Sequence, residues 1–279
     1  MLTIAKLRDK YHADICAKMI HLKKGGKPSM ADVNSKLSVT ISKNLMSRIP
    51  HKIGVSLVKG QTAGTILEQL TRGFLEQAFK LLLHLRPGQW AFSLHTSISK
   101  FDQYGHLTDL ADIIRKNPAI RSALGDYIIS PDIIVARQPV SDAEIDRQKI
   151  LTKGKSLCRF TPLRMANKSA PTLHASISCK WTLRSDRSQN ARTEGLNLIR
   201  NRKGRTPHIA VVTGEPMPTR IASLALGTGD IDCVYHFALH ELIEAVNETK
   251  DEAAIDSLTM MIDGRRLRDI SDLPFDLAL

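Results

Sequence analysis

Cysteine is scarce in this chain of 279 residues, and the cysteines that it has are scattered. The four are Cys16, Cys158, Cys179 and Cys233, and none of them forms a CxxC pair. This spacing argues against a zinc knuckle. The chain also lacks a secretory signal and an apolar run long enough to span a bilayer. We therefore expect a reduced, intracellular protein of the cytoplasm, with no membrane partner.

Acidic residues are in short supply as well. Lys and Arg number 40 against 28 Asp and Glu, which gives a formal charge of +12 and a pI near 9.7. A surplus of this size favours a polyanionic partner, with nucleic acid first and an anionic membrane second. The alternative is a basic surface that only aids solubility. The hydrophobic content of 42% is ordinary for a globular protein.

The chain shows no internal repeat, low-complexity tract or clear linker, so we expect a single domain over residues 1–279. Two short β-branched segments, 127–135 and 174–181, are bounded by turn signals and predict strands. An amphipathic run over residues 61–85 and a polar run over residues 184–204 predict helices. Together these segments predict an α/β fold in which helices flank a central mixed sheet.

Three charged residues, far apart in the sequence, fall in or next to these segments. Asp132 lies near the middle of the first strand, Lys180 lies on the second, and Glu194 lies on the helix that follows. A charged residue in so apolar a strand needs a partner or a metal ion. If the two strands are neighbours, two carboxylates and an ammonium group meet at one edge of the sheet. Such a cluster suits a divalent metal ion and a phosphodiester.

These residues also have the spacing of a known motif. Pro131-Asp132 is followed at long range by Ser178-Cys179-Lys180, and thirteen residues then separate Lys180 from Glu194. This pattern resembles the permuted active site of the type II (IIF) restriction endonucleases of the PD-(D/E)XK superfamily that read a CCGG core. The usual superfamily pattern has an acid two residues before the lysine. Ser178 occupies that place here, and Glu194 supplies the missing carboxylate.

The resemblance extends from about Asp32 to Arg220. The segment that contains Arg184, Asp186 and Arg187 matches the R-x-D-R sequence with which this family reads CCGG. The run from Gln61 to Gly64, followed by Glu68, is similar to the family's N-terminal segment, in which the glutamate is an additional active-site acid. The resemblance implies six DNA-contacting residues: Arg184, Asp186 and Arg187 on the core, Arg220 on the outer G:C pair, Asp32 on an outer base and Gln61 in the minor groove.

Phosphodiester hydrolysis needs an activated water and a means of stabilising charge on the phosphoryl oxygens. Mg²⁺ supplies both, and a second ion can stabilise the leaving oxygen. Asp132 and Glu194 offer the oxygen ligands that a hard cation prefers, with the carbonyl of Cys179 implied as a further ligand. Lys180 can hold the attacking water or stabilise the phosphate charge. Glu68 can orient Lys180 or a metal-bound water, and Ser178 is auxiliary.

The resemblance therefore implies a restriction-endonuclease-like fold and a bacterial Mg²⁺-dependent type II restriction endonuclease with two metal ions in each active site. Its substrate is double-stranded DNA with a GCCGGC site or a close CCGG-core relative. Relatives form homotetramers of two back-to-back dimers, which implies cooperation between two DNA sites. A cognate methyltransferase is expected to act on the same site without binding the enzyme directly.

Several alternatives remain open from the residues alone. Glu68 lies in the first turns of its predicted helix, where an acid also compensates the helix dipole. Arginine and aspartate at the spacing of Arg184 and Asp186 often form a solvated ion pair. At the level of the protein, one alternative is a repair or junction-resolving nuclease of the same superfamily. Another is a basic DNA-binding protein without catalysis. A Ser/His hydrolase ranks lower, because Ser178 lacks a nucleophile-elbow context.

Overall fold

The computed structural model of the chain describes residues 1–54, 60–117, 122, 128–151, 157–227 and 229–279, without the side chains of residues 60, 61 and 185–187. Within these ranges, six strands form one sheet in the order β3, β4, β5, β6, β7 and β8. Their bounds are Trp90–Leu94, Ile133–Arg137, Thr172–Lys180, His208–Thr213, Cys233–His236 and Leu267–Asp269. The pairs β3–β4 and β4–β5 are antiparallel, and the remaining pairs are parallel. The predicted central mixed sheet is thus confirmed.

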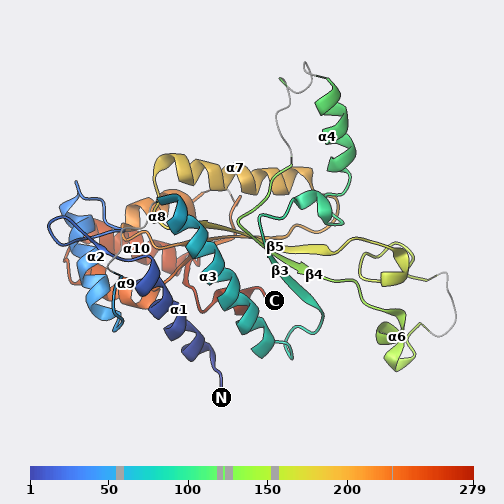
Figure 1. Ribbon diagram of the computed structural model, residues 1–279, viewed down its shortest axis with the longest axis horizontal. Helices are drawn as coiled ribbons and strands as arrows, with labels where there is room; N and C mark the ends of the chain where they lie inside the picture. Colours follow the sequence, from blue (N-terminus) through green and yellow to red (C-terminus); the bar gives the residue numbers. More distant parts are fainter. Residues whose placement is uncertain (55–59, 118–121, 123–127, 152–156, 228) are drawn as a thin grey trace.

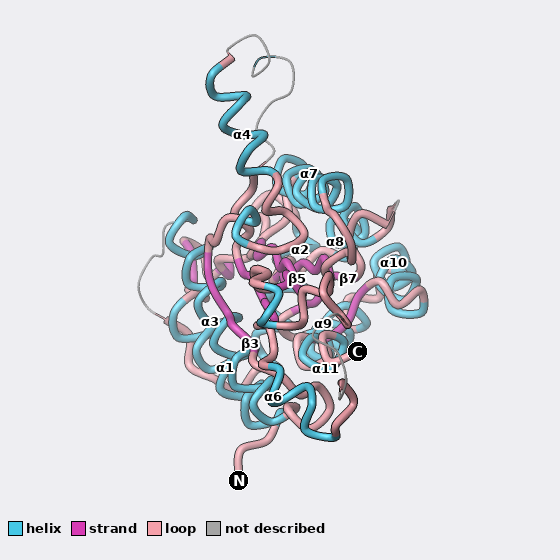
Figure 2. The backbone as a smooth tube through the Cα atoms, turned by 90° about the vertical axis from the view of Figure 1, so that its right-hand side faces the viewer, coloured by secondary structure: helices cyan, strands magenta, loops and turns pink. Residues whose placement is uncertain are grey.

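Helices cover both faces of this sheet. Figures 1 and 2 show α1 and α3 on one face and α7 and α8 on the other, while α4 stands away from the body. The helices have the bounds α1 Ile4–Lys18, α2 Lys36–Arg48, α3 Gly60–Leu81, α4 Leu107–Lys116, α6 Asp142–Ile145, α7 Ser185–Asn201, α8 Pro218–Ala225, α9 Leu239–Asn247, α10 Glu252–Asp263 and α11 Leu273–Asp276.

Several of these helices begin with a residue whose side chain caps the first turn. Thr3 accepts a hydrogen bond from the backbone N–H of Lys6, and Asp251 accepts one from the N–H of Ala254. Such caps satisfy donors that the first helical turn leaves without an intrahelical partner. α7 differs, because its N-cap is Arg184 and no side chain caps it.

The central strands are buried on both sides. Residues 133–136 of β4 and 173–179 of β5 are all buried. These β4 residues form a continuous apolar run, as is typical of a strand covered on both faces. β5 instead alternates, with the buried polar residues His174, Ser176 and Ser178 between apolar ones. The helices and the sheet share one contiguous hydrophobic core. The ends of β4 and β5 are therefore rigid supports for the polar side chains that lie there.

The structure corrects the prediction for Asp132. We expected this residue near the middle of a strand over residues 127–135, but β4 begins at Ile133 and Asp132 immediately precedes it; Tyr127 lies outside the described residues. Pro131 has no backbone N–H to give to a ladder, which explains why the strand does not extend further toward the N-terminus. The Asp132 carboxylate instead accepts the backbone N–H of Cys179 on β5 at 2.7 Å.

Elements in two further regions of the chain were not expected from the sequence. The basic segment that includes Lys23 and Lys27 forms a two-stranded hairpin, β1 (Leu22–Lys23) and β2 (Lys27–Pro28), around two glycines with positive φ. At the other end of the chain, β8 and α11 are three and four residues long. Segments of that length are too short for a periodic pattern to distinguish. In the described ranges no helix has the length and apolar character needed to cross a membrane.

Candidate active site

An ion pair lies where β4 begins and β5 ends. Nζ of Lys180 lies 2.9 Å from Oδ2 of Asp132, and both side chains are more than four-fifths buried. The antiparallel pairing of β4 with β5 produces this contact, because Ile133, the residue after Asp132, is paired with Ile177. The same Oδ2 accepts the N–H of Cys179, so one carboxylate oxygen is fixed by a charge and by the backbone.

Ser178 joins Glu194 to this pair. Its hydroxyl lies 3.4 Å from Oδ2 of Asp132 and 3.3 Å from Oε2 of Glu194. Glu194 comes from α7, which begins five residues after β5 and runs back across the sheet. The structure therefore brings together Asp132, Ser178, Lys180 and Glu194, as the motif spacing predicted.

Glu68 reaches the same region from α3. Only 7% of the residue is exposed, and Oε2 lies 2.8 Å from Nε2 of His95. His95 follows β3 with a positive φ of 48°, and its backbone N–H donates to the carbonyl of Asp132 at 3.4 Å. The predicted role of Glu68 is to orient Lys180 or a metal-bound water, and in the structure it forms an ion pair with His95. No motif in the sequence singled out His95.

The pKa shifts show which acids of this cluster have too little positive charge nearby. Burial raises the pKa of Glu194, and the nearby charge of Asp132 adds to the rise while Lys180 opposes it. Burial also raises the pKa of Glu68, again with a contribution from Asp132. Burial alone would lower the pKa of Lys180, but the charges of Asp132 and Glu194 leave it raised. The lysine is therefore held as an ammonium ion, while the carboxylates still lack positive charge.

The donor set fits a hard divalent cation. Asp132 and Glu194 provide carboxylate oxygens, and the main chain at Cys179 lies next to them because its N–H binds Asp132. The Cys179 thiol is buried, and burial raises its pKa well above the usual range, so it is unsuited to be a thiolate ligand. Among the described residues, no three His, Cys, Asp or Glu side chains form a ready-made metal cage. Two carboxylates suit an ion such as Mg²⁺, which retains several of its waters.

A second polar site lies near the start of α7. Asp32, Arg184 and Arg220 line one open pocket of about 660 Å³, although they are far apart in the sequence. Arg220 donates to Oδ2 of Asp32. The pKa of Asp32 is lowered, first by the N–H of Asn34 and then by Arg220. Three of the six predicted DNA-contacting residues thus share one pocket. The side chains of Gln61, Asp186 and Arg187 lie outside the described set.

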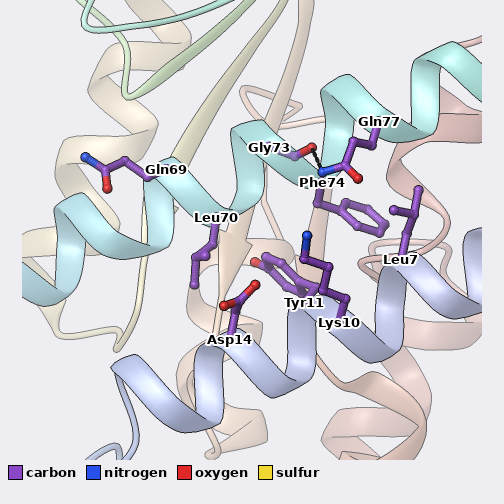
Figure 3. A pocket seen from close by; sticks show the side chains of 9 residues that line it. All are labelled: Leu7, Lys10, Tyr11, Asp14, Gln69, Leu70, Gly73, Phe74 and Gln77. Carbon is purple, nitrogen blue, oxygen red and sulfur yellow. Dashed lines mark hydrogen bonds between the residues drawn. The ribbon is translucent and has the colours of Figure 1, made fainter.

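A third concavity lies away from this chemistry. Figure 3 shows it between α1 and α3, with Tyr11 and Asp14 on one helix and Leu70 and Gln77 on the other. Its volume is about 120 Å³, and none of the predicted site residues lines it. Glu68 is on the same helix as Leu70 but takes part in the active-site cluster, so α3 supports both regions.

Comparison with known proteins agrees with this geometry. The family model described as NgoMIV restriction enzyme matches residues 11–279 of the chain. The type II restriction enzyme NgoMIV of Neisseria gonorrhoeae is 49% identical over 260 residues, which cover 91% of each chain. The protein is a type II restriction endonuclease, an enzyme that cleaves DNA at specific sequences, with a restriction-endonuclease-like fold. The chain belongs to the NgoMIV restriction enzyme family. Restriction endonucleases generally depend on a divalent metal ion.

Proposed function

We propose that this enzyme hydrolyses double-stranded DNA at GCCGGC or a close CCGG-core site and that its metal ion is Mg²⁺, with two ions in each active site. The observation that carries this proposal is the convergence of the Asp132–Lys180 ion pair with Glu194, which Ser178 links to Asp132, where β4 begins and β5 ends. The nuclease unit is a single domain over residues 1–279. The contiguous core of the described residues supports this assignment.

In this proposal Asp132, Glu194 and the carbonyl of Cys179 hold the metal ion. When bound, Mg²⁺ polarises the scissile phosphate and lowers the pKa of a coordinated water. Lys180 stays protonated beside Asp132, so its ammonium group stabilises negative charge on the phosphate and positions the attacking water. Ser178 aligns the carboxylates of Asp132 and Glu194 through its hydroxyl. Glu68 adds a further acid from α3.

In this proposal, the pocket at the start of α7 recognises the bases of the DNA sequence. Arginine is the best donor for guanine O6 and N7, and aspartate accepts from cytosine N4. The hydrogen bond between Arg220 and Asp32 supports their assignment to one outer G:C pair, because it places this donor and acceptor side by side. Arg184, Asp186 and Arg187 read the CCGG core in this proposal. Gln61 contacts the minor groove.

We also propose that the enzyme acts as a homotetramer made of two dimers, each of which holds one DNA site. The described parts of the connection between β4 and β5, which include α6, project from the body in Figure 1. This connection exposes Phe160 by 96%, Ile150 by 67% and Met165 by 53%. Exposed apolar side chains on a projecting segment favour contact with a second copy of the chain. As a bacterial restriction enzyme, the protein would act in the cytoplasm, and a cognate methyltransferase would protect the same sites.

A digest of mapped plasmids tests the proposal. We expect discrete bands with Mg²⁺, no cleavage with EDTA, and faster cleavage of a plasmid with two GCCGGC sites than of one with a single site. Asp132→Ala should abolish cleavage and retain binding in a gel-shift assay without Mg²⁺, because it removes a metal ligand and leaves the DNA-binding pocket intact. A smear of products or full activity of Asp132→Ala would contradict the proposal.

A further inference from the structure

Glu215 is a fully buried carboxylate that none of the motifs includes. It lies two residues after β6 and has an exposed fraction of 0%. Its Oε2 accepts the backbone N–H of Leu183 at 2.8 Å, and its Oε1 accepts the N–H of Met217 at 3.2 Å. A buried carboxylate is costly unless hydrogen bonds compensate it, and here each oxygen accepts one backbone N–H.

The two amides bound by Glu215 begin the two segments that carry base-reading side chains. Leu183 immediately precedes Arg184, the N-cap of α7 and the first residue of the R-x-D-R segment. Met217 is the N-cap of α8, which carries Arg220. Nη1 of Arg220 also lies 3.9 Å from Oε1 of Glu215, while Nη2 donates to Asp32. One side chain therefore fixes the start of both helices and faces the guanidinium group of Arg220.

The same segment is attached to the catalytic strand. The hydroxyl of Thr213 donates to the carbonyl of Lys180 at 2.7 Å and accepts the N–H of Glu215 at 3.1 Å. Between them, Gly214 donates its N–H to the carbonyl of Trp181 at 3.0 Å. A Cβ atom on Gly214 would lie 2.3 Å from the Trp181 ring, so only glycine permits this close packing. The turn that presents Glu215 is thus held against the end of β5.

We propose that Glu215 is a positioning residue for sequence discrimination, which holds the R-x-D-R segment and Arg220 in one rigid unit beside the catalytic lysine. This inference rests on the base-reading roles proposed above. Burial raises the pKa of Glu215 to about 7, although its bonds to the N–H groups of Leu183 and Met217 oppose the rise. The two arginine-bearing segments approach different base pairs, so loss of their common anchor weakens discrimination at inner and outer positions together.

The test compares kcat/KM on the cognate site with kcat/KM on sites that carry one changed inner or outer base pair. In Glu215→Gln, the amide can accept one backbone N–H but not both. We expect the preference for the cognate site to fall by about tenfold or more at both positions. Glu215→Asp, which keeps the charge but is one methylene shorter, should recover part of the preference. Saturating kcat on the cognate site should change less than kcat/KM.

Asp269→Asn is the matched control. Asp269 is also fully buried, and it accepts the N–H of Leu239 at 3.0 Å and that of Ser271 at 2.9 Å, together with an arginine. Its substitution should lower stability and leave base preference unchanged. A loss of preference equal to that of Glu215→Gln would mean that general destabilisation is responsible, and it would overturn the inference.

Arg187→Ala separates this inference from the proposed readout. If the base readers are assigned correctly, Arg187→Ala should relax preference at one base by about tenfold. Relaxation in Arg187→Ala with unchanged preference in Glu215→Gln would overturn only the role of Glu215. A uniform loss across all sequences in Arg187→Ala would instead overturn the readout assignment.

Discussion

The molecule contains two buried clusters in which one basic residue meets several acids, and the pKa values of the acids shift in opposite directions. In the first, Arg8 makes four hydrogen bonds of 2.7 to 2.9 Å with the carboxylates of Glu241 and Asp269. In the second, the single ammonium group of Lys180 faces Asp132, Glu194 and the nearby acid Glu68. We refer to them as the arginine cluster and the lysine cluster.

The pKa shifts of the acids separate the two clusters. Burial would raise the pKa of Asp269, but its bonds to Arg8 and Ser271 lower it to about 2, and those to Arg8 lower that of Glu241. In the lysine cluster, burial raises the pKa of both Glu194 and Glu68. In the arginine cluster the positive charge of Arg8 is therefore enough to stabilise both carboxylates. In the lysine cluster the charge of Lys180 is not enough to offset the burial of Glu194 and Glu68. The shortage marks the place where an external cation would be most favourable.

Removing the basic residue from each cluster tests this difference most strongly. Lys180→Ala should lower the cleavage rate by about 10²–10³-fold or more, because an electrostatic group beside the phosphate is lost. Its stability should fall by less than that of Arg8→Ala, because the carboxylate left without its partner, Asp132, is 16% exposed, whereas Asp269 is fully buried. Arg8→Ala should cost about 3–5 kcal/mol of unfolding free energy, because it leaves Asp269 buried without its partner.

Both variants should be measured by urea unfolding and by cleavage rate per folded molecule. If Arg8→Ala were fully stable but inactive, or if Lys180→Ala unfolded while the remaining folded enzyme cleaved normally, the assignment of the two clusters would be reversed.

Stability against pH gives a second contrast, between Asp269 and Glu215. The pKa of Glu215 is about 7 in the folded chain and 4.5 in its ordinary state, so its contribution to stability is present below about pH 4.5 and lost as pH rises through 7. For Asp269 the folded pKa of about 2 lies below the ordinary 3.8, so its contribution is present above 3.8 and lost as pH falls through 2.

We therefore expect Glu215 to lower the unfolding free energy by up to about 3 kcal/mol between about pH 5 and pH 8. Glu215→Gln should remove this slope in urea titrations across that range, whereas Asp269→Asn should retain it. An unchanged slope in Glu215→Gln would show that another group titrates there.

The lysine cluster was predictable from the sequence because its residues belong to a motif with a fixed spacing. The sheet was predictable where short β-branched runs lie between turn signals, and the strand expected over residues 174–181 largely coincides with β5. The position of Asp132 was predicted wrongly, because an apolar pattern does not show where a ladder stops at a proline.

His95 and Glu215 could not be predicted, because their importance comes from tertiary contacts. His95 meets Glu68 only after β3 is placed beside β4, and Glu215 meets Leu183 only through the parallel pairing of β5 with β6. Neither residue has a neighbour in sequence that indicates these contacts. The arginine cluster could not be predicted for the same reason, because Arg8 and Asp269 lie at opposite ends of the chain.

The smallest expected difference concerns one serine in each cluster. Ser271 donates to Oδ1 of Asp269 at 2.6 Å, whereas Ser178 lies 3.3 and 3.4 Å from Glu194 and Asp132. Ser271→Ala should cost about 1.5 kcal/mol of stability, as for a hydrogen bond to a charged group, and leave the cleavage rate unchanged. Ser178→Ala removes only long hydrogen bonds, so its stability should fall by less than about 1 kcal/mol. Its cleavage rate should nevertheless fall several-fold, because Asp132 and Glu194 lose their common donor. Equal rates in the two variants would show that Ser178 does not align the acids.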